Sequence, residues 1–125
     1  MPALHESHNL GDLLKYEAPN LYSRDRATVA AGQQLSLGTV VGRDCTSKKL
    51  WALDPAAEDG SERAVGVLAA DIDATQADNP NALLIARHAI VSPAALVWPP
   101  EITPAVKDAA IARLKGLGVL VRTAA

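Results

Sequence analysis

The sequence LVWPPEITPAVKDAAIARLKGLGVLVR, residues 96–122, holds the clearest structural signals of the chain. Thr103 followed by Pro104 is typical of a helix N-terminus, because threonine caps free backbone amides and proline fits the first helical position. Apolar residues then recur at three- and four-residue spacing, which predicts one buried helix face. That face consists of Val106, Ala110, Ile111, Leu114 and Leu117.

The residues on either side of this helix predict strands. The apolar run 94–98 reads as a strand, and it ends at Pro99 and Pro100, which cannot donate to a β-ladder. After the helix, Gly116 and Gly118 are candidate left-handed stop positions. Residues 119–121 then form a β-branched final strand. The span therefore predicts one amphipathic helix between two strands.

The residues before this span, 26–93, alternate short apolar runs with turn residues, which is typical of a β protein. The predicted strands are residues 27–30, 35–37, 39–43, 48–54, 64–70 and 82–91. The run 64–70 is apolar throughout, as in strands that are covered on both faces. Polar stretches at 55–63 and 71–81 predict surface loops. The fold class is therefore mainly β, with one helix in the C-terminal half followed by a final strand.

The first 25 residues lack any sustained period, and we interpret them as an N-terminal arm that is mobile until something binds it. Within them, NLGDLLKY (residues 9–16) predicts one turn of helix, too short to be stable alone in water. The predicted organisation is an arm, residues 1–25, and a β domain, residues 26–125. The alternative is a disordered terminus without function.

Composition limits both the core and the partners. The chain has 125 residues, no Phe and only 3% aromatic residues, so its core must be aliphatic and modest, and a partner subunit would add to stability. The net charge is −2 and no basic run exists, which argues against nucleic-acid binding. A single cysteine excludes an internal disulfide. No stretch has the pattern of a membrane span or a secretion signal, so we expect a soluble protein.

Candidate chemical groups are few and incomplete. Three aspartates in one polar loop resemble a calcium loop, but the places where an EF-hand needs glycine and glutamate hold Gln76 and Ala82. These aspartates are Asp71, Asp73 and Asp78. Two N-terminal histidines, His5 and His8, lack further metal ligands nearby. Cys45 and His88 lack an orienting third group. We therefore expect no catalytic residues, no metal and no cofactor.

Three motifs occur in a characteristic order. They are S-x-K-L-x-A-x-D, carried by Ser47, Lys49, Leu50, Ala52 and Asp54; A-V-G-(V/I)-L-A, carried by residues 64–69; and L-x-W-P, carried by Leu96, Trp98 and Pro99. Over residues 22–122 the chain resembles the lambda-type head decoration proteins of tailed bacteriophages. It departs from their pattern in the loop 71–81 and in its first twenty residues.

The resemblance implies a small bent β ribbon or incomplete barrel, β-clip-like, that is not an enzyme. Such proteins bind as homotrimers to the outside of the expanded phage head, at local threefold positions, and clamp neighbouring subunits of the major capsid protein. Their N-terminal arm becomes ordered against the shell. The resemblance further implies a late structural protein of the virion, made in the host cytoplasm, that uses no cofactor and contacts neither nucleic acid nor membrane.

Two small sets of residues are candidates for these contacts. For capsid binding they are Leu21, Tyr22, Ser23 and Arg24, where the arm meets the domain. The alternative for Tyr22 is that it plugs the base of the barrel. For the trimer interface, or alternatively the core, they are Trp98, Pro99 and Pro100. The competing functions are a small β-barrel ligand-binding module, with Trp51, Trp98 and His88 around a pocket, and an enzyme that uses Cys45 and His88.

Overall fold

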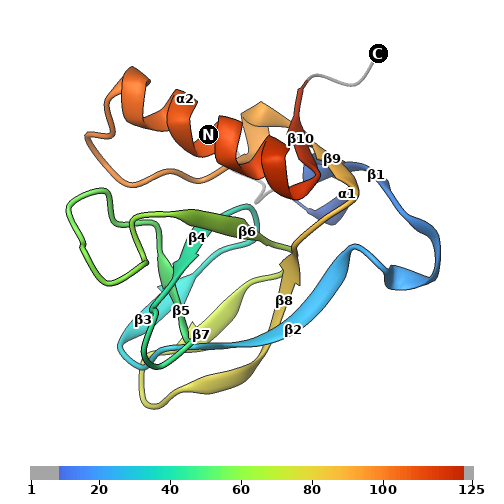
Figure 1. Cartoon of the computed structure of the whole chain (residues 1–125). Helices are drawn as coiled ribbons and strands as arrows, with labels where there is room; N and C mark the ends of the chain where they lie inside the picture. The colour runs from blue at the N-terminus through green and yellow to red at the C-terminus, as the bar shows by residue number, and fades with distance from the viewer. Residues whose placement is uncertain (1–8, 123–125) are drawn as a thin grey trace, which may run out of the picture.

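The computed structural model describes residues 9–122, which form ten strands, two α-helices and two 3₁₀ turns (Figure 1). The strands are β1 (Leu14–Glu17), β2 (Arg24–Val29), β3 (Gln33–Leu35), β4 (Val40–Arg43), β5 (Leu50–Ala52), β6 (Ala64–Leu68), β7 (Ile72–Ala74), β8 (Asn79–Ile85), β9 (Ala89–Val91) and β10 (Val119–Val121). The helical elements are α1 (Leu10–Leu13), η1 (Pro19–Leu21), η2 (Pro93–Ala95) and α2 (Pro104–Leu117). The predicted class, mainly β with one main helix before a final strand, is confirmed.

Five strands form a ring in the order β2-β5-β4-β6-β8. Four of the five neighbouring pairs are antiparallel, and the fifth, β2 with β5, is parallel and consists only of Val29 opposite Leu50. The expected incomplete barrel is therefore a ring whose closure depends on one residue pair. A separate ribbon of β3 and β7 lies beside the ring.

A second layer covers one end of the ring and contains both ends of the described chain. In its three-stranded sheet β9 lies in the centre, antiparallel to β1 and parallel to β10. Helix α2 packs against β6 of the ring and against β10, as the upper half of Figure 1 shows. The core beneath α2 is aliphatic, and its fully buried side chains include Leu13, Val91, Leu114 and Val119.

Helix α2 begins and ends where the sequence predicts. The Thr103 hydroxyl accepts a hydrogen bond from the Val106 amide at 3.3 Å, and Gly118 ends the helix in the left-handed region at φ 96°. The other predicted stop, Gly116, lies inside the helix. The buried face of α2 is narrower than predicted, because Val106 and Leu117 are 37% and 38% exposed. Neither described helix is long and apolar enough to cross a membrane.

The predicted strand 82–91 is wrong, because the segment contains parts of two strands in two different sheets. Strand β8 belongs to the ring and β9 to the upper sheet, and the chain turns between them at His88, whose φ is 49°. Arg87 and His88 interrupt the apolar run at this turn, and the prediction of one continuous strand passed over that polar break. The predicted loop 71–81 likewise contains β7, which pairs with β3. The predicted strand 94–98 is instead the turn η2 followed by a single bridge between Thr39 and Val97.

The described part of the predicted arm, residues 9–25, is built into the fold. The Leu13 side chain is completely buried, and the backbone carbonyl of Leu13 accepts a 2.7 Å hydrogen bond from the Ser92 amide. Strand β1 pairs with β9. Residues 1–8 lie outside the described residues, so the domain boundary near residue 25 stays a prediction.

Gly42 gives a test of the ring. A Cβ atom at Gly42 would lie 2.3 Å from the carbonyl oxygen of Ser61, so Gly42→Ala forces the backbone apart. We expect it to lower the free energy of unfolding by about 1–3 kcal/mol in urea titrations. Gly116→Ala is the control, because nothing lies within 4 Å and the position is helical. It should stabilise the protein by roughly 0.5–1 kcal/mol. Equal effects of the two substitutions would contradict this packing.

Candidate functional site

Two exposed apolar residues, Leu21 and Tyr22, form a tip between β1 and β2. Their side chains are 60% and 56% exposed. The backbone is left-handed at Asn20 and Leu21, with φ of 62° and 58°, which is costly for non-glycine residues. In Figure 1 this turn projects from the right-hand edge of the molecule. Tyr22 therefore does not plug the barrel, and we call Leu21 and Tyr22 the apolar tip.

A carboxylate from β1 holds the base of the tip. Glu17 accepts hydrogen bonds from the Ser23 hydroxyl at 2.5 Å and from Arg24 at 2.9 Å (Nε) and 2.6 Å (Nη2). The fork-like pairing with Arg24 fixes direction as well as distance. Arg24, and then the Ser23 hydroxyl, hold the pKa of Glu17 below its usual range against the opposing effect of burial. Ser23 is completely buried, so it orients the tip from inside.

Arg87 holds the other side of the tip. Its Nη1 donates to the Tyr22 carbonyl oxygen at 2.7 Å, and its Nη2 bonds to the Asp25 carboxylate. The guanidinium carbon also lies 5.5 Å from the centre of the Tyr22 ring. The Tyr22 ring meets the His88 ring edge-on, with the ring centres 5.0 Å apart. Arg87 and His88 thus support the apolar tip, a role that the sequence did not predict for them.

A second exposed apolar surface surrounds Trp98, and we call it the Trp98 face. It comprises Trp51, Val97, Trp98, Pro99 and Pro100, which line two adjoining hollows. Trp51 and Val97 are 39% and 40% exposed, whereas the Trp98 ring packs partly against the core. The Trp98 Nε1 is buried and has no hydrogen-bond partner among residues 9–122. A buried donor of this kind needs an acceptor.

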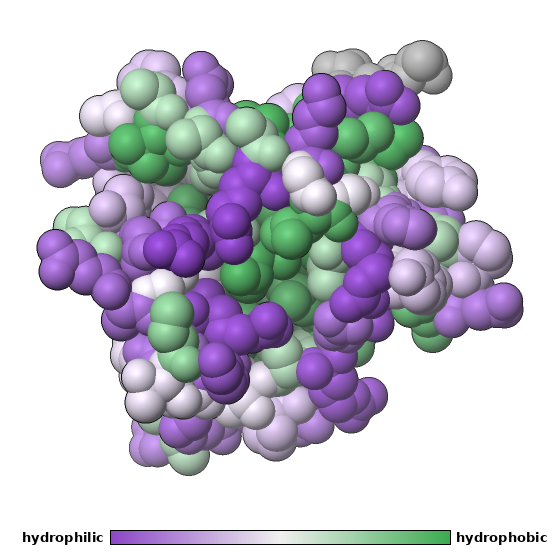
Figure 2. Space-filling view, viewed as in Figure 1, coloured by the Kyte–Doolittle hydropathy of each residue, from purple (hydrophilic) through white to green (hydrophobic). Residues whose placement is uncertain are grey.

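A third apolar region lies between α2 and the ring. Its hollow is lined by Val65, Leu84 and Leu117, with Asp25 and Arg87 among its polar residues. Figure 2 shows hydrophobic surface exposed between the helix and the ring, with a hydrophilic rim.

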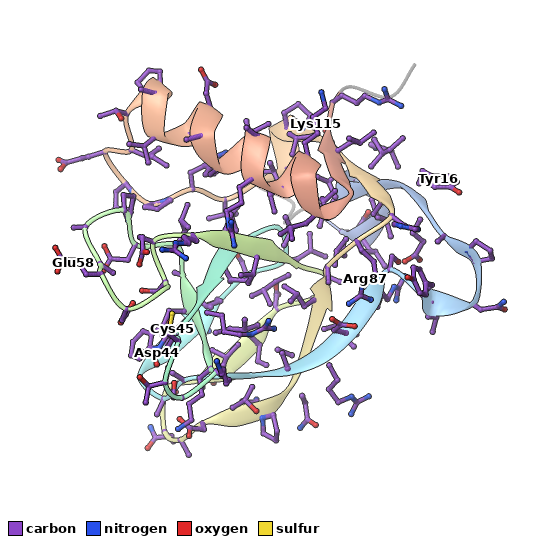
Figure 3. All side chains as sticks on the ribbon, in the orientation of Figure 1. Tyr16, Asp44, Cys45, Glu58, Arg87 and Lys115 are labelled. Carbon is purple, nitrogen blue, oxygen red and sulfur yellow. The ribbon has the colours of Figure 1, made fainter. Side chains whose placement is uncertain are left out.

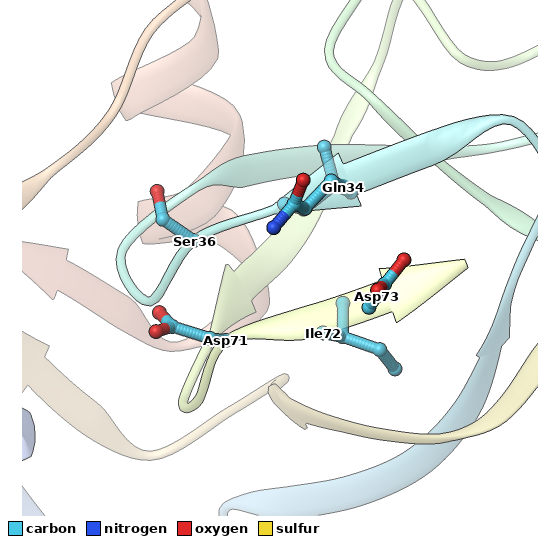
Figure 4. A pocket seen from close by; sticks show the side chains of 6 residues that line it. Gln34, Ser36, Asp71, Ile72 and Asp73 are labelled. Carbon is cyan, nitrogen blue, oxygen red and sulfur yellow. The ribbon is translucent and has the colours of Figure 1, made fainter. Parts of the chain in front are cut away.

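The three loop aspartates have local structural roles. Asp71 accepts a 2.7 Å hydrogen bond from the Leu37 amide, and Asp73 caps the turn at Thr75, whose hydroxyl and amide lower the pKa of Asp73. Figure 4 shows Asp71 and Asp73 at a hollow that residues 34–36 and 71–73 line. Asp78 bonds to the Ala31 amide and to Lys49. Among the described residues, no group of three His, Cys, Asp or Glu side chains could hold a metal ion.

The residues of the two competing functions do not form one site, because His88 lies apart from the Trp98 face and from Cys45. Trp51, Trp98 and His88 line three different hollows. Cys45 lies beside Gly60, whereas His88 lies against Tyr22 and Gly118. In Figure 3 Cys45 is at the left of the molecule and Arg87, the neighbour of His88, is at the right. His5 and His8 lie outside the described residues.

The pairing of Glu17 with Arg24 predicts an acid-dependent loss of stability. A carboxyl whose pKa is lowered by folding stabilises the folded state above its unfolded pKa, and this contribution disappears as pH falls. Glu17→Gln should therefore lower the unfolding free energy by about 1 kcal/mol at pH 7. The difference from the parent should shrink well below roughly pH 4.3, the ordinary pKa of glutamate.

Urea unfolding at both pH values measures this difference. The control is Glu58→Gln, because Glu58 makes no hydrogen bond or ion pair within the described chain. This substitution should leave the free energy of unfolding unchanged at both pH values. A Glu17→Gln effect of the same size at both pH values would show that the charge on Glu17 contributes nothing.

Comparison with known families connects these surfaces to a role. A sequence model of the bacteriophage lambda head decoration protein D family matches residues 3–119. No individually curated protein matches the chain. The family consists of structural proteins on the exterior of the phage capsid and is not an enzyme family. Because the match covers most of the chain, the protein belongs to the bacteriophage lambda head decoration protein D family.

Proposed function

We propose that the protein binds as a homotrimer to the outside of an expanded phage head, at local threefold positions, and clamps neighbouring subunits of the major capsid protein. The observation that carries the proposal is the family match over residues 3–119. Capsid decoration follows from the family itself. The stoichiometry, the position on the head and the contact surfaces go beyond the family match, and two exposed apolar surfaces support the contacts.

The apolar tip is the proposed shell contact. Leu21 and Tyr22 offer apolar and aromatic surface to a partner, and Tyr is a frequent anchor residue at protein interfaces. Glu17, Ser23 and Arg87 already hold the turn in its left-handed conformation. A preorganised contact loses less conformational entropy on binding. In this proposal Ser23 and Arg24 position the tip, and Leu21 and Tyr22 touch the shell.

The capsid-pairing arm is proposed to be shorter than the sequence suggested. Residues 9–17 belong to α1 and β1, whose Leu13 fills the core. The arm is therefore assigned to residues 1–8, which lie outside the described residues. Strand addition to an edge of the capsid protein is the kind of contact we assign to it.

The Trp98 face is the proposed contact between subunits. Contact between copies at this face would remove Val97 and Trp51 from water, which favours association. A cyclic trimer joins two different surfaces of the subunit, so the Trp98 face meets another part of the neighbouring copy. Three linked tips then bind the shell with greater avidity than a single tip.

The tip variant Leu21→Ser/Tyr22→Ser tests the shell contact. Co-sedimentation with expanded heads that lack their own decoration protein should show binding at least roughly tenfold weaker, because an aromatic anchor is lost. The control Val106→Ser/Leu117→Ser removes two apolar side chains of 37% and 38% exposure from α2 and should bind normally. Deletion of residues 2–8 in the same assay measures the contribution of the arm separately. Full binding by the tip variant would exclude the tip as a contact.

Val97→Asp tests the subunit contact. A carboxylate placed at the Trp98 face would be desolvated in the trimer, so sedimentation velocity should show monomers where the parent forms trimers. The matched substitution is Leu117→Asp, because the two parent residues have similar exposure. If Leu117→Asp dissociates the trimer and Val97→Asp does not, the interface is the hollow between α2 and the ring.

A further inference from the structure

The weak closure of the ring leaves an opening on its surface. Strands β2 and β5 run parallel but pair only at Val29 and Leu50. On the N-terminal side of that pair, residues 26–28 of β2 and residues 47–49 before β5 line a hollow of about 450 Å³. In Figure 1 this region lies in the lower part of the molecule, away from α2 and the upper sheet. We call it the basic seam.

Four cations gather around the basic seam. They are Arg26, Arg43, Lys48 and Lys49, and the hydroxyl residues Thr28 and Ser47 complete the polar lining. No acidic residue lines the hollow. Lys49 is paired with Asp78, whereas the other three cations make no ion pair or side-chain hydrogen bond within residues 9–122. This grouping stands out in a chain whose net charge is −2.

A tight turn fixes the position of two of the cations. The Asp44 carboxylate accepts the amides of Thr46 at 2.8 Å and Ser47 at 2.7 Å. The Lys48 amide donates to the Asp44 carbonyl at 2.9 Å, and the Asp44 amide donates to the Lys49 carbonyl at 3.0 Å. Lys48 has a φ of 64°, the left-handed region in which lysine is unusual. The turn therefore holds Lys48 and Lys49 opposite β2 before any ligand arrives.

We propose that the basic seam binds an oxyanion of the phosphate or sulfate class. Unpaired cations that share a hollow repel one another, and a multiply charged anion relieves that repulsion. A single arginine fork fits a carboxylate or a phosphate, but several separate donors around one hollow suit a group with three or four oxygens better than a carboxylate with two. The four cations surround one hollow, whereas nucleic-acid binding uses a run of phosphate contacts. This site is independent of the proposed shell and subunit contacts.

A phosphate or sulfate group could reach the basic seam as a free ion or as a group carried on a polysaccharide. Two probes distinguish these sources. Sodium pyrophosphate represents the free ion, and heparin represents polymer-borne sulfate. Polyglutamate of a length similar to that of the heparin represents a polymer that carries carboxylates in place of sulfates. Titration calorimetry at low ionic strength measures each affinity, and the affinity for either oxyanion should fall as salt is added.

The variant Arg26→Gln/Lys48→Gly removes two of the unpaired cations. Glycine accepts the left-handed backbone at position 48, so the turn is kept. The control Lys115→Gln/Arg122→Gln makes the same change in net charge at α2 and after β10. We expect oxyanion affinity to fall at least roughly tenfold in the first variant and to stay near the parent value in the second, because charged hydrogen bonds are lost only in the first.

Each outcome decides the proposal. Binding of pyrophosphate supports a free oxyanion as ligand, and binding of heparin alone supports a polymer-borne group. The proposal is overturned if neither probe binds, or if the two variants behave alike, which would indicate diffuse attraction to the whole surface. Polyglutamate that binds as tightly as heparin would also overturn it, and would indicate an acidic protein partner.

Discussion

Leu13, Leu114 and Val119 are completely buried in one aliphatic cluster that also takes in Val91 and Ala95. These residues come from α1, α2, β10, β9 and η2, so the cluster ties both ends of the described chain to the middle. A chain without Phe buries less area per side chain, and a sufficient core then requires contributions from the whole length. Loss of this cluster would release β1 and, with it, the turn that carries Leu21 and Tyr22.

The exposed surfaces follow from that constraint. Because aliphatic residues fill the interior, the large aromatic side chains lie at or near the surface, where Tyr22 and Trp51 remain accessible. Tyr22 stays in place because Arg87, and Glu17 through its hydrogen bond with Ser23, hold the turn beneath it. A rigid body with an apolar tip is suited to adhesion, since little order has to be gained at that contact when it docks. The basic seam has a different origin, because it opens where the ring closes through one residue pair.

Local chemistry explains which features the sequence predicted correctly. Thr103, Pro104 and Gly118 act through their immediate neighbours, so the bounds of α2 follow from the sequence. The division of residues 82–91 between two sheets depends on partners far along the chain, and its local mark is only the polar pair Arg87 and His88. The burial of Leu13 was missed for the same reason, since its neighbours Val91 and Leu114 are remote in sequence. The sequence nominated Leu21 and Tyr22 as capsid contacts, which stays a proposal, and nothing in it pointed to Arg87, which lies 65 residues from the carbonyl it binds.

The most direct test of adhesion through the apolar tip is a cryo-electron microscopy reconstruction of expanded heads saturated with the protein. The account predicts trimeric density on the outer surface at each local threefold position, with Leu21 and Tyr22 against the capsid protein. Density that places this tip toward solvent, or an absence of added density at those positions, would contradict it.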